Sequence, residues 1–157
     1  MISTQRDEVN ALLKRFGSQY GLDACALDQQ GSALLAFDDL FVDVLLNEER
    51  GELLILATVG RPAPSAEIYG WLLDGNLFGL GARGMALARD SAGHSIILRR
   101  ALPITSLELD QFEAALEEFL LAAESVRRRL ALSEAAGTGD RAEAHLAPQL
   151  MQNLLRA

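Results

Sequence analysis

The stretch that decides the fold is PSAEIYGWLLDGNLFGLGARGMALARD, residues 64–90. Apolar residues recur at helical spacing up to Phe78, a glycine-rich turn follows over 79–84, and large and small residues alternate from Met85. The stretch therefore predicts a helix, a turn and a strand. The helix carries the only tryptophan, Trp71, on a face too apolar to leave in water. We expect a second copy of the chain to cover it.

The segment before this stretch predicts a helix and an antiparallel meander. The helix runs from about Ser3 to Phe16, with Thr4 and Asp7 as an N-terminal capping pair and Gly17 as its end. Four apolar runs separated by turn residues then predict strands. The runs are ACALD (24–28), SALLAFD (32–38), FVDVLLN (41–47) and ELLILATVG (52–60). They are apolar on both faces, so we expect the terminal helices to cover one face and a partner to cover part of the other.

The segment after the central stretch predicts a hairpin, a long helix and a tail. MALARD and HSIILRRAL form the hairpin, and Thr105 with Glu108 fits a capping box at the start of the last helix. Arg127, Arg128 and Arg129 complement the dipole at the end of that helix. The small and polar run from Ser133 predicts a flexible segment. Leu146–Leu155 fits a short amphipathic helix that needs a docking surface, such as a groove left open without a client.

These elements predict an α+β fold, in which a twisted antiparallel sheet packs with three main helices. The expected order is α-β-β-β-β-α-β-β-α, in one domain at 1–132 followed by a flexible tail at 133–157.

Composition restricts the classes of partner. The chain has 157 residues with 22 acidic and 14 basic side chains, a net charge of −8, and only one lysine. Nucleic acid is an unsuitable partner, because phosphate binding needs clustered cations. No apolar run approaches the ~20 residues that span a bilayer, so no membrane insertion is expected. The N-terminus lacks the basic and apolar regions of a signal peptide, so the expected location is the cytoplasm. Cys25, the only cysteine, is expected to be a buried, unreactive thiol.

Residues 79–84 spell G-x-G-x-x-G, which matches a dinucleotide-binding fingerprint in letters only. That fingerprint needs a strand before the glycines and a helix after them, so that the helix N-terminus faces the pyrophosphate. Here the predicted order is reversed. We interpret the glycines as a turn and expect no cofactor.

The other candidate chemical groups are also better explained by structure. Asp38 and Asp39 fit a hairpin turn, and Asp43 fits the solvated position of a strand, without the pattern of a calcium loop. His94 and His145 stand in no nucleophile and base pattern. We therefore predict no catalytic residue, no metal site and no enzymatic activity.

Four segments, in order, resemble the type III secretion chaperones of the Tir-chaperone (CesT-like) family. They are LLKRFGSQYGL, LDQQGSALLAFDD, LLDGNLFGLGARGMALARD and LRRALPITSLELDQFEAALEEFLLAAESVRRRL, and the resemblance covers about residues 8–130. It implies a small acidic bacterial homodimer of the cytoplasm. Such a protein binds the N-terminal segment of an effector in extended form and keeps it soluble and competent for secretion. The resemblance adds the secretion ATPase as a further expected partner.

Two sets of residues follow from the resemblance by position. The expected dimer interface comprises Ile68, Trp71, Leu72, Phe78, Met85 and Leu87. The expected effector-binding residues are Leu12, Phe16, Leu34, Ala36, Val42 and Val44. For the second set ordinary core packing remains an alternative, because the sequence does not say which strand face points inward. Two other functions also remain open: a regulatory protein of the same fold that sequesters a small anti-activator or other secretion regulator, and an enzyme or ligand-binding domain on the same fold, for which a polar, enclosed pocket would be the evidence.

Overall fold

The computed structural model describes residues 4–92 and 94–137. The elements, in order, are α1 (Gln5–Tyr20), β1 (Ser32–Phe37), β2 (Leu40–Asn47), β3 (Glu52–Gly60), α2 (Ala66–Phe78), the 3₁₀ turn η1 (Gly81–Arg83), β4 (Met85–Asp90), β5 (Ser95–Pro103) and α3 (Leu109–Gly137). The α+β fold with three main helices and an antiparallel sheet is confirmed.

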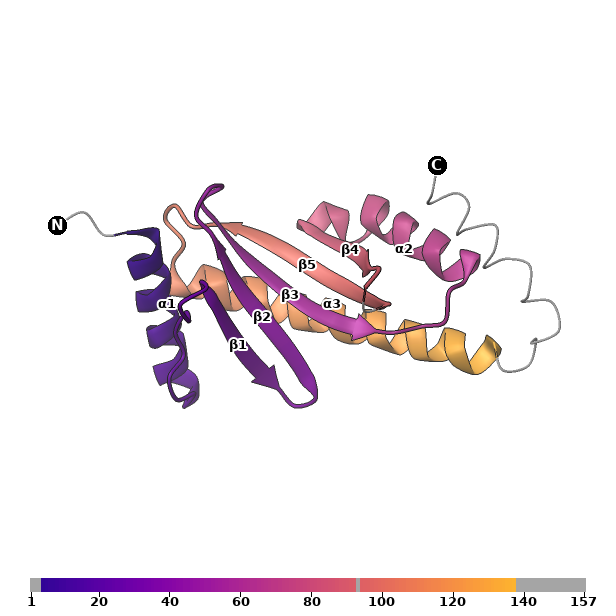
Figure 1. Cartoon of the computed structure of the whole chain (residues 1–157), viewed down its shortest axis with the longest axis horizontal. Coiled ribbons are helices and arrows are strands. Elements are labelled where there is room, and N and C mark those ends of the chain that lie inside the picture. The colour runs from indigo at the N-terminus through magenta and orange to yellow at the C-terminus, as the bar shows by residue number, and fades with distance from the viewer. Residues whose placement is uncertain (1–3, 93, 138–157) are drawn as a thin grey trace.

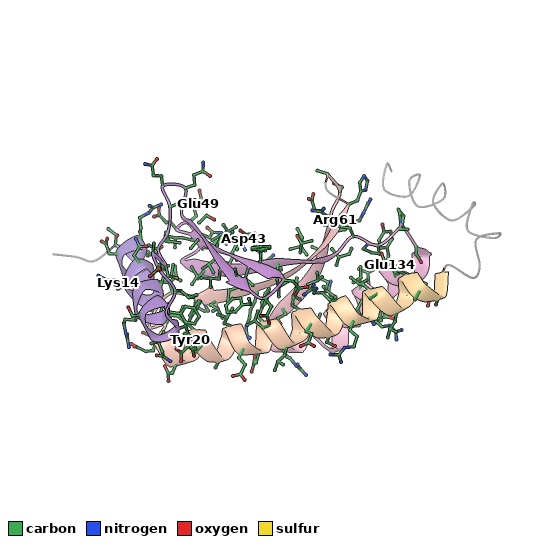
Figure 2. The ribbon with its side chains drawn as sticks, turned by 90° about the horizontal axis from the view of Figure 1, so that it is seen from below. Lys14, Tyr20, Asp43, Glu49, Arg61 and Glu134 are labelled. Atoms are coloured by element: carbon green, nitrogen blue, oxygen red, sulfur yellow. The ribbon has the colours of Figure 1, made fainter. Side chains whose placement is uncertain are left out.

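The five strands form one antiparallel sheet in the order β1-β2-β3-β5-β4. In Figure 1, α3 runs the length of the sheet, α1 lies across one end, and α2 lies beside β4 at the other end. Figure 2 shows the two layers from the side, with α3 against one face of the sheet and Asp43 pointing away from the opposite face. The sheet thus has one face covered by α3 and one open face.

The core lies between α3 and the covered face of the sheet. Phe112 and Phe119 of α3 are fully buried there, against Val42, Ile55 and other strand residues that are equally inaccessible. Phe16 of α1 meets the Phe112 ring edge-on, with 5.4 Å between ring centroids. Aromatic rings in this arrangement add a specific contact to the burial of their area. The last helix therefore joins α1 to the sheet.

The predicted first helix is confirmed, but its end is different. Thr4 accepts a hydrogen bond from the Asp7 N–H, and the Asp7 carboxylate accepts one from the Thr4 N–H, which is the predicted capping box. The helix continues past Gly17 and ends at Gly21, which has a φ of 66°. Gly17 is needed for another reason: a Cβ there would lie 2.7 Å from the Cβ of Cys25.

The run ACALD was wrongly predicted as a strand, so the sheet has three strands before α2 instead of four. Its backbone groups are engaged elsewhere: the Leu27 N–H donates to Oδ1 of Asn10 on α1 at 2.8 Å. Ala24 has a φ of 55°, which is incompatible with an extended strand. The run packs on α1 instead, where partial burial raises the pKa of the Cys25 thiol.

The central stretch forms the predicted helix, turn and strand. The turn depends on Gly81, because a Cβ at this position would lie 1.8 Å from the carbonyl oxygen of Asn76. Gly84 follows with a φ of 70°. The six-residue glycine pattern is therefore a reversal of the chain between α2 and β4.

The bounds of the last helix differ from the prediction at both ends. It starts at Leu109, so the predicted cap at Thr105 was wrong: Ser106 in the preceding loop has a φ of 62°, and the Glu108 N–H donates to Oε1 of Gln111 at 3.1 Å. It continues to Gly137, five residues beyond the predicted boundary at 132/133, so Arg127–Arg129 lie inside the helix instead of at its end. The predicted short helix at 146–155 lies outside the described residues.

Candidate protein-binding surface

The open face of the sheet carries exposed large apolar side chains. Leu34 of β1 is 61% exposed and Phe41 of β2 is 59% exposed. The strand register places Ala36, also exposed, opposite Phe41, and Leu34 opposite Asp43. Half-buried apolar residues extend this surface across the sheet: Leu45, Leu54, Leu56 and Ile97. Solvent-exposed leucine and phenylalanine on neighbouring strands of one sheet face are typical of a protein-binding site.

The outer edge of β1 borders this surface and presents backbone hydrogen-bonding groups. The Leu46 N–H donates a hydrogen bond to the Gly31 carbonyl at 2.8 Å. This bond fixes which residues of β1 direct their N–H and C=O groups toward β2 and which direct them outward, because the two kinds alternate along the strand. Ser32 accordingly turns outward, where its N–H and C=O bond to Asp28. By the same alternation, Leu34 and Ala36 direct their N–H and C=O outward, with no backbone partner among residues 4–92 and 94–137. They form an open strand edge.

The opposite edge of the sheet is closed by a side chain. Leu87 of β4 donates its N–H to Oδ1 of Asn76 at 2.6 Å and accepts a hydrogen bond from Nδ2 of Asn76 at 2.9 Å. The amide of Asn76 thus occupies the position of another strand. Of the two edges, that of β1 is available for pairing and that of β4 is blocked along Leu87.

The turn between β1 and β2 is held against α3 by an ion pair. Nη1 of Arg127 lies 2.9 Å from Oδ1 of Asp39, and Nη2 contacts the second carboxylate oxygen. This hydrogen bonding lowers the pKa of Asp39 from its ordinary value of 3.8. The contact joins residues 88 positions apart in sequence and fixes the tip of the hairpin that carries Ala36 and Phe41.

Replacing Asp39 with asparagine is expected to mobilise the hairpin tip with little change in the unfolding temperature, since exposed ion pairs contribute little stability. The carboxylate pKa is lowered by folding, so the stabilisation is present above the ordinary pKa and is lost as pH falls through the lowered one. Backbone amide relaxation at Leu40 measures the effect. The Asp39→Asn variant at neutral pH should match the acidified wild type, and Asp38→Asn is the control. Unchanged relaxation in Asp39→Asn would contradict the role of the ion pair.

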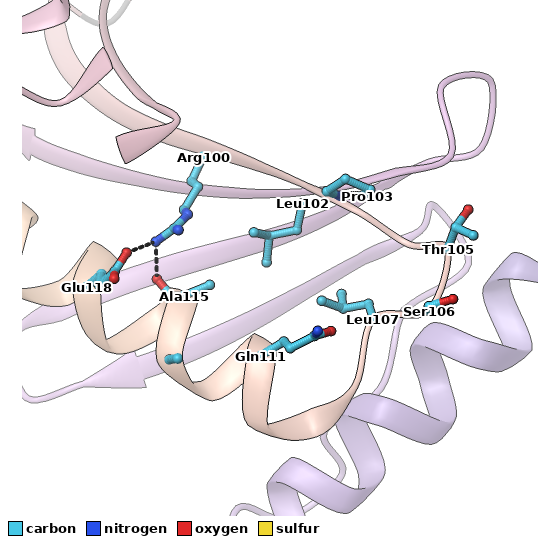
Figure 3. A pocket seen from close by; sticks show the side chains of 10 residues that line it. Arg100, Leu102, Pro103, Thr105, Ser106, Leu107, Gln111, Ala115 and Glu118 are labelled. Carbon is cyan, nitrogen blue, oxygen red and sulfur yellow. Dashed lines mark hydrogen bonds and ion pairs between the residues drawn. The ribbon is translucent and has the colours of Figure 1, made fainter. Parts of the chain in front are cut away.

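Two hollows lie beside the loop that leads into α3. One, of about 490 Å³, runs between β5 and α3, with Leu102, Leu107 and Ala115 on its walls (Figure 3). At its far end Nη1 of Arg100 contacts Oε2 of Glu118 at 2.8 Å and the Ala115 carbonyl at 3.0 Å. The other, of about 270 Å³, lies between α1 and this loop. Both hollows combine apolar walls with polar or charged residues at their margins, such as Arg100 and Glu118 in the larger and Glu8 and Glu108 in the smaller.

The structure separates the six predicted effector-binding residues into two groups. Leu34 and Ala36 lie together on the open face and the open edge. The other four are buried in the core: Leu12, Phe16, Val42 and Val44. Leu12 also lines the smaller hollow. Phe41 was missed, although the alternation of Phe41 and Asp43 with Val42 and Val44 places it on the same face as Leu34.

The predicted dimer residues are also distributed unevenly. Four of them are buried in the core of their own chain: Ile68, Leu72, Met85 and Leu87. Trp71 is half-buried, with the Arg129 guanidinium 5.8 Å from its ring centroid, and the side chain of Phe78 lies outside the described part. The exposed apolar residues of α2 are Leu73 (69%) and Leu77 (68%), one helical turn apart. Sequence reasoning missed both, because it followed the side of the helix that carries Trp71.

The described residues contain no group of three or more histidine, cysteine, aspartate or glutamate side chains that could hold a metal ion. Within the same residues, no helix is both long and apolar enough to cross a membrane.

Comparison with known proteins places the fold among secretion chaperones. The family model of the Tir chaperone protein (CesT) family matches residues 11–127. A protein of Chlamydia pneumoniae is 29% identical over 113 residues, which cover 69% of this chain and 85% of that protein.

Several solved structures share the fold of this chain. The ExsC-ExsE complex contains a chain of 31% identity and TM-score 0.75, covering 82% of this chain and 97% of that one. The HopA1-SchA chaperone-effector complex matches at 18% identity and TM-score 0.69, over 82% and 99%. The Yersinia pestis type III secretion chaperone SycH, in complex with a stable fragment of YscM2, matches at 21% identity and TM-score 0.60, over 74% and 98%. The last two show the fold alone.

Proposed function

The chain belongs to the Tir chaperone protein (CesT) family, and from this premise we propose that it is a cytoplasmic type III secretion chaperone. It binds the N-terminal segment of a secreted effector in extended form and keeps that segment soluble and secretion-competent. The observation that carries the proposal is the open edge of β1 beside the exposed Leu34 and Phe41. This combination suits an extended polypeptide, which can pair its main chain with the strand edge and place side chains on the adjoining face.

The physical basis of binding is strand addition. A client segment that pairs with β1 gains main-chain hydrogen bonds from the outward groups of Leu34 and Ala36, whatever its sequence. Its alternate side chains would lie on the open face, beside Leu34 and Phe41, where apolar residues bind best. An extended client loses conformational entropy when it binds, so the interface must be large enough to compensate for that loss. The chain's net charge of −8 helps to keep such a complex soluble.

A second copy of the chain is the proposed partner of α2. Leu73 and Leu77 form an apolar strip on the side of this helix that faces away from the core. A symmetric contact brings two such strips together, because a twofold interface uses the same surface of both copies. Ile68, Leu72, Met85 and Leu87 then support the interface from within each core. The secretion ATPase remains a further predicted partner.

The regulatory alternative keeps a specific observation in its favour. The chain is more similar to the one solved in the ExsC-ExsE complex than to the one in the HopA1-SchA chaperone-effector complex, at 31% against 18% identity. A small secretion regulator is therefore the second candidate client. It would use the same open edge, and its size would distinguish it from an effector.

The test is co-expression of this chain with N-terminal segments of secreted proteins encoded beside it. We expect one segment to co-purify in a stable complex while it stays sensitive to protease outside the bound residues, as an extended client should. A client that binds only through a folded domain would contradict the proposal. A client that is a small regulator throughout would favour the alternative.

A further inference from the structure

We infer that residues 146–155 of this chain dock into a hollow beside the C-terminal half of α3, as the second arm of a helical hairpin. This hollow, here called the α3 hollow, lies between residues 124–134 and the end of β3 at residues 59–61. The inference goes beyond the proposed function and does not depend on it.

The α3 hollow has a volume of about 380 Å³ and an apolar floor. Val59 and Leu130 form this floor and are 4% and 3% exposed. Ala131 lies at its rim and is exposed, and the next residue, Leu132, is 62% exposed. Charged side chains surround the apolar part: Arg61, Glu124, Arg127, Arg128 and Glu134. An apolar floor with a charged rim suits an amphipathic segment.

The sequence of the tail fits this surface. Pro148 is favoured at the first position of a helix. In a helix of residues 148–156, Leu150, Met151, Leu154 and Leu155 share one side, while Gln149 and Gln152 lie on the other. A helix of this length is marginal in water and gains stability only by docking.

The residues between α3 and the tail determine how far the tail can reach and in which direction it runs. α3 ends at Gly137, three residues after Glu134 of the hollow. The following residues, Gly137-Thr138-Gly139-Asp140, are a turn-forming sequence. Ten residues, 138–147, then connect the end of α3 to a helix that begins at Pro148, and when extended they can span up to about 33 Å. The distance back along α3 from Gly137 to Glu124 is only about 20 Å at about 1.5 Å per residue, so a chain that reverses at this turn can place the tail helix beside residues 124–134, which include the residues of α3 that line the hollow.

The other exposed apolar surfaces fit the tail less well. The open face of the sheet lies across the sheet from α3 (Figure 2). Leu73 and Leu77 point away from the core on α2, where a second copy is the proposed occupant. The α3 hollow, in contrast, includes Glu134, three residues before the end of α3 at Gly137.

Disulfide trapping in the full chain tests the position of the tail. In a Cys25→Ser background, Ala131→Cys with Leu150→Cys should oxidise readily to a bridge within one chain. Leu73→Cys with Leu150→Cys and Leu34→Cys with Leu150→Cys should oxidise several-fold more slowly. Faster bridging to either of these positions, equal rates at all three, or a bridge between two chains would overturn the inference.

A matched pair of charge variants tests the apolar contact itself. Leu150→Glu with Leu154→Glu should raise amide hydrogen exchange at residues 128–134 several-fold. Gln149→Glu with Gln152→Glu adds the same charge on the other side of the predicted helix and should leave exchange unchanged. The inference fails if the leucine variant has no effect or if the glutamine variant has an equal one.

Discussion

The Leu34→Asp variant is expected to bind its client roughly 30- to 150-fold more weakly than the wild type, a loss of about 2–3 kcal/mol. Leu34 is 61% exposed in the free chain, so the substitution should cost little folding stability. In the complex, a client strand paired with β1 would cover this side chain, and the aspartate would have to lose water without a partner. Isothermal titration with the captured N-terminal segment measures the affinity.

The control is Leu121→Asp. Leu121 is 62% exposed on α3, so the variant makes the same chemical change at the same exposure on the other side of the sheet. Its affinity for the client should stay within about twofold of the wild type, close to the error of such a measurement. Equal losses in the two variants would show that the open face has no special role.

The variant with both Leu73→Asp and Leu77→Asp is expected to change the mass of the protein in solution. By light scattering, the wild type should have about twice the 17.0 kDa of one chain, and the variant should have the mass of one chain. Four carboxylates would meet at the twofold axis, where charges are repelled and desolvated. These positions test the interface better than Trp71, because Trp71 packs under Arg129 and its replacement would also disturb the fold.

Leu121→Asp with Leu132→Asp provides the matched control for the dimer. Both leucines are 62% exposed and lie on α3, so the variant carries the same added charge on a different helix. It should keep twice the chain mass. A wild type that stays at the mass of one chain at all concentrations would contradict the homodimer, while client binding on β1 would remain open to its own test.

Sequence patterns predicted those elements whose signals are local. The central helix, turn and strand follow from the spacing of apolar residues and from glycines, and the close approach of Gly81 to Asn76 explains why the turn needs glycine. ACALD has the composition of a strand, but its hydrogen-bonding partner is Asn10 on another element. A pattern within five residues cannot report such a partner.

The candidate site depended on a choice that the sequence leaves open. Leu34 and Leu35 are equally apolar neighbours, yet Leu35 is buried and Leu34 is exposed. Alternation assigns them to opposite faces, and only the position of α3 decides which face is covered. The same limitation explains why Val42 and Val44 were selected and Phe41 was not. On α2, the tryptophan marked the buried side, while the exposed Leu73 and Leu77 lie on the other.

The most direct test of strand addition is the amide hydrogen exchange of Leu34 and Ala36, measured with and without the client segment. Both N–H groups point out of the sheet edge in the free chain and should exchange quickly. If the client adds a strand to β1, both amides should become strongly protected in the complex, together with alternate amides of the client. Unchanged exchange at these two amides in a saturated complex would contradict the account and place the client elsewhere on the molecule.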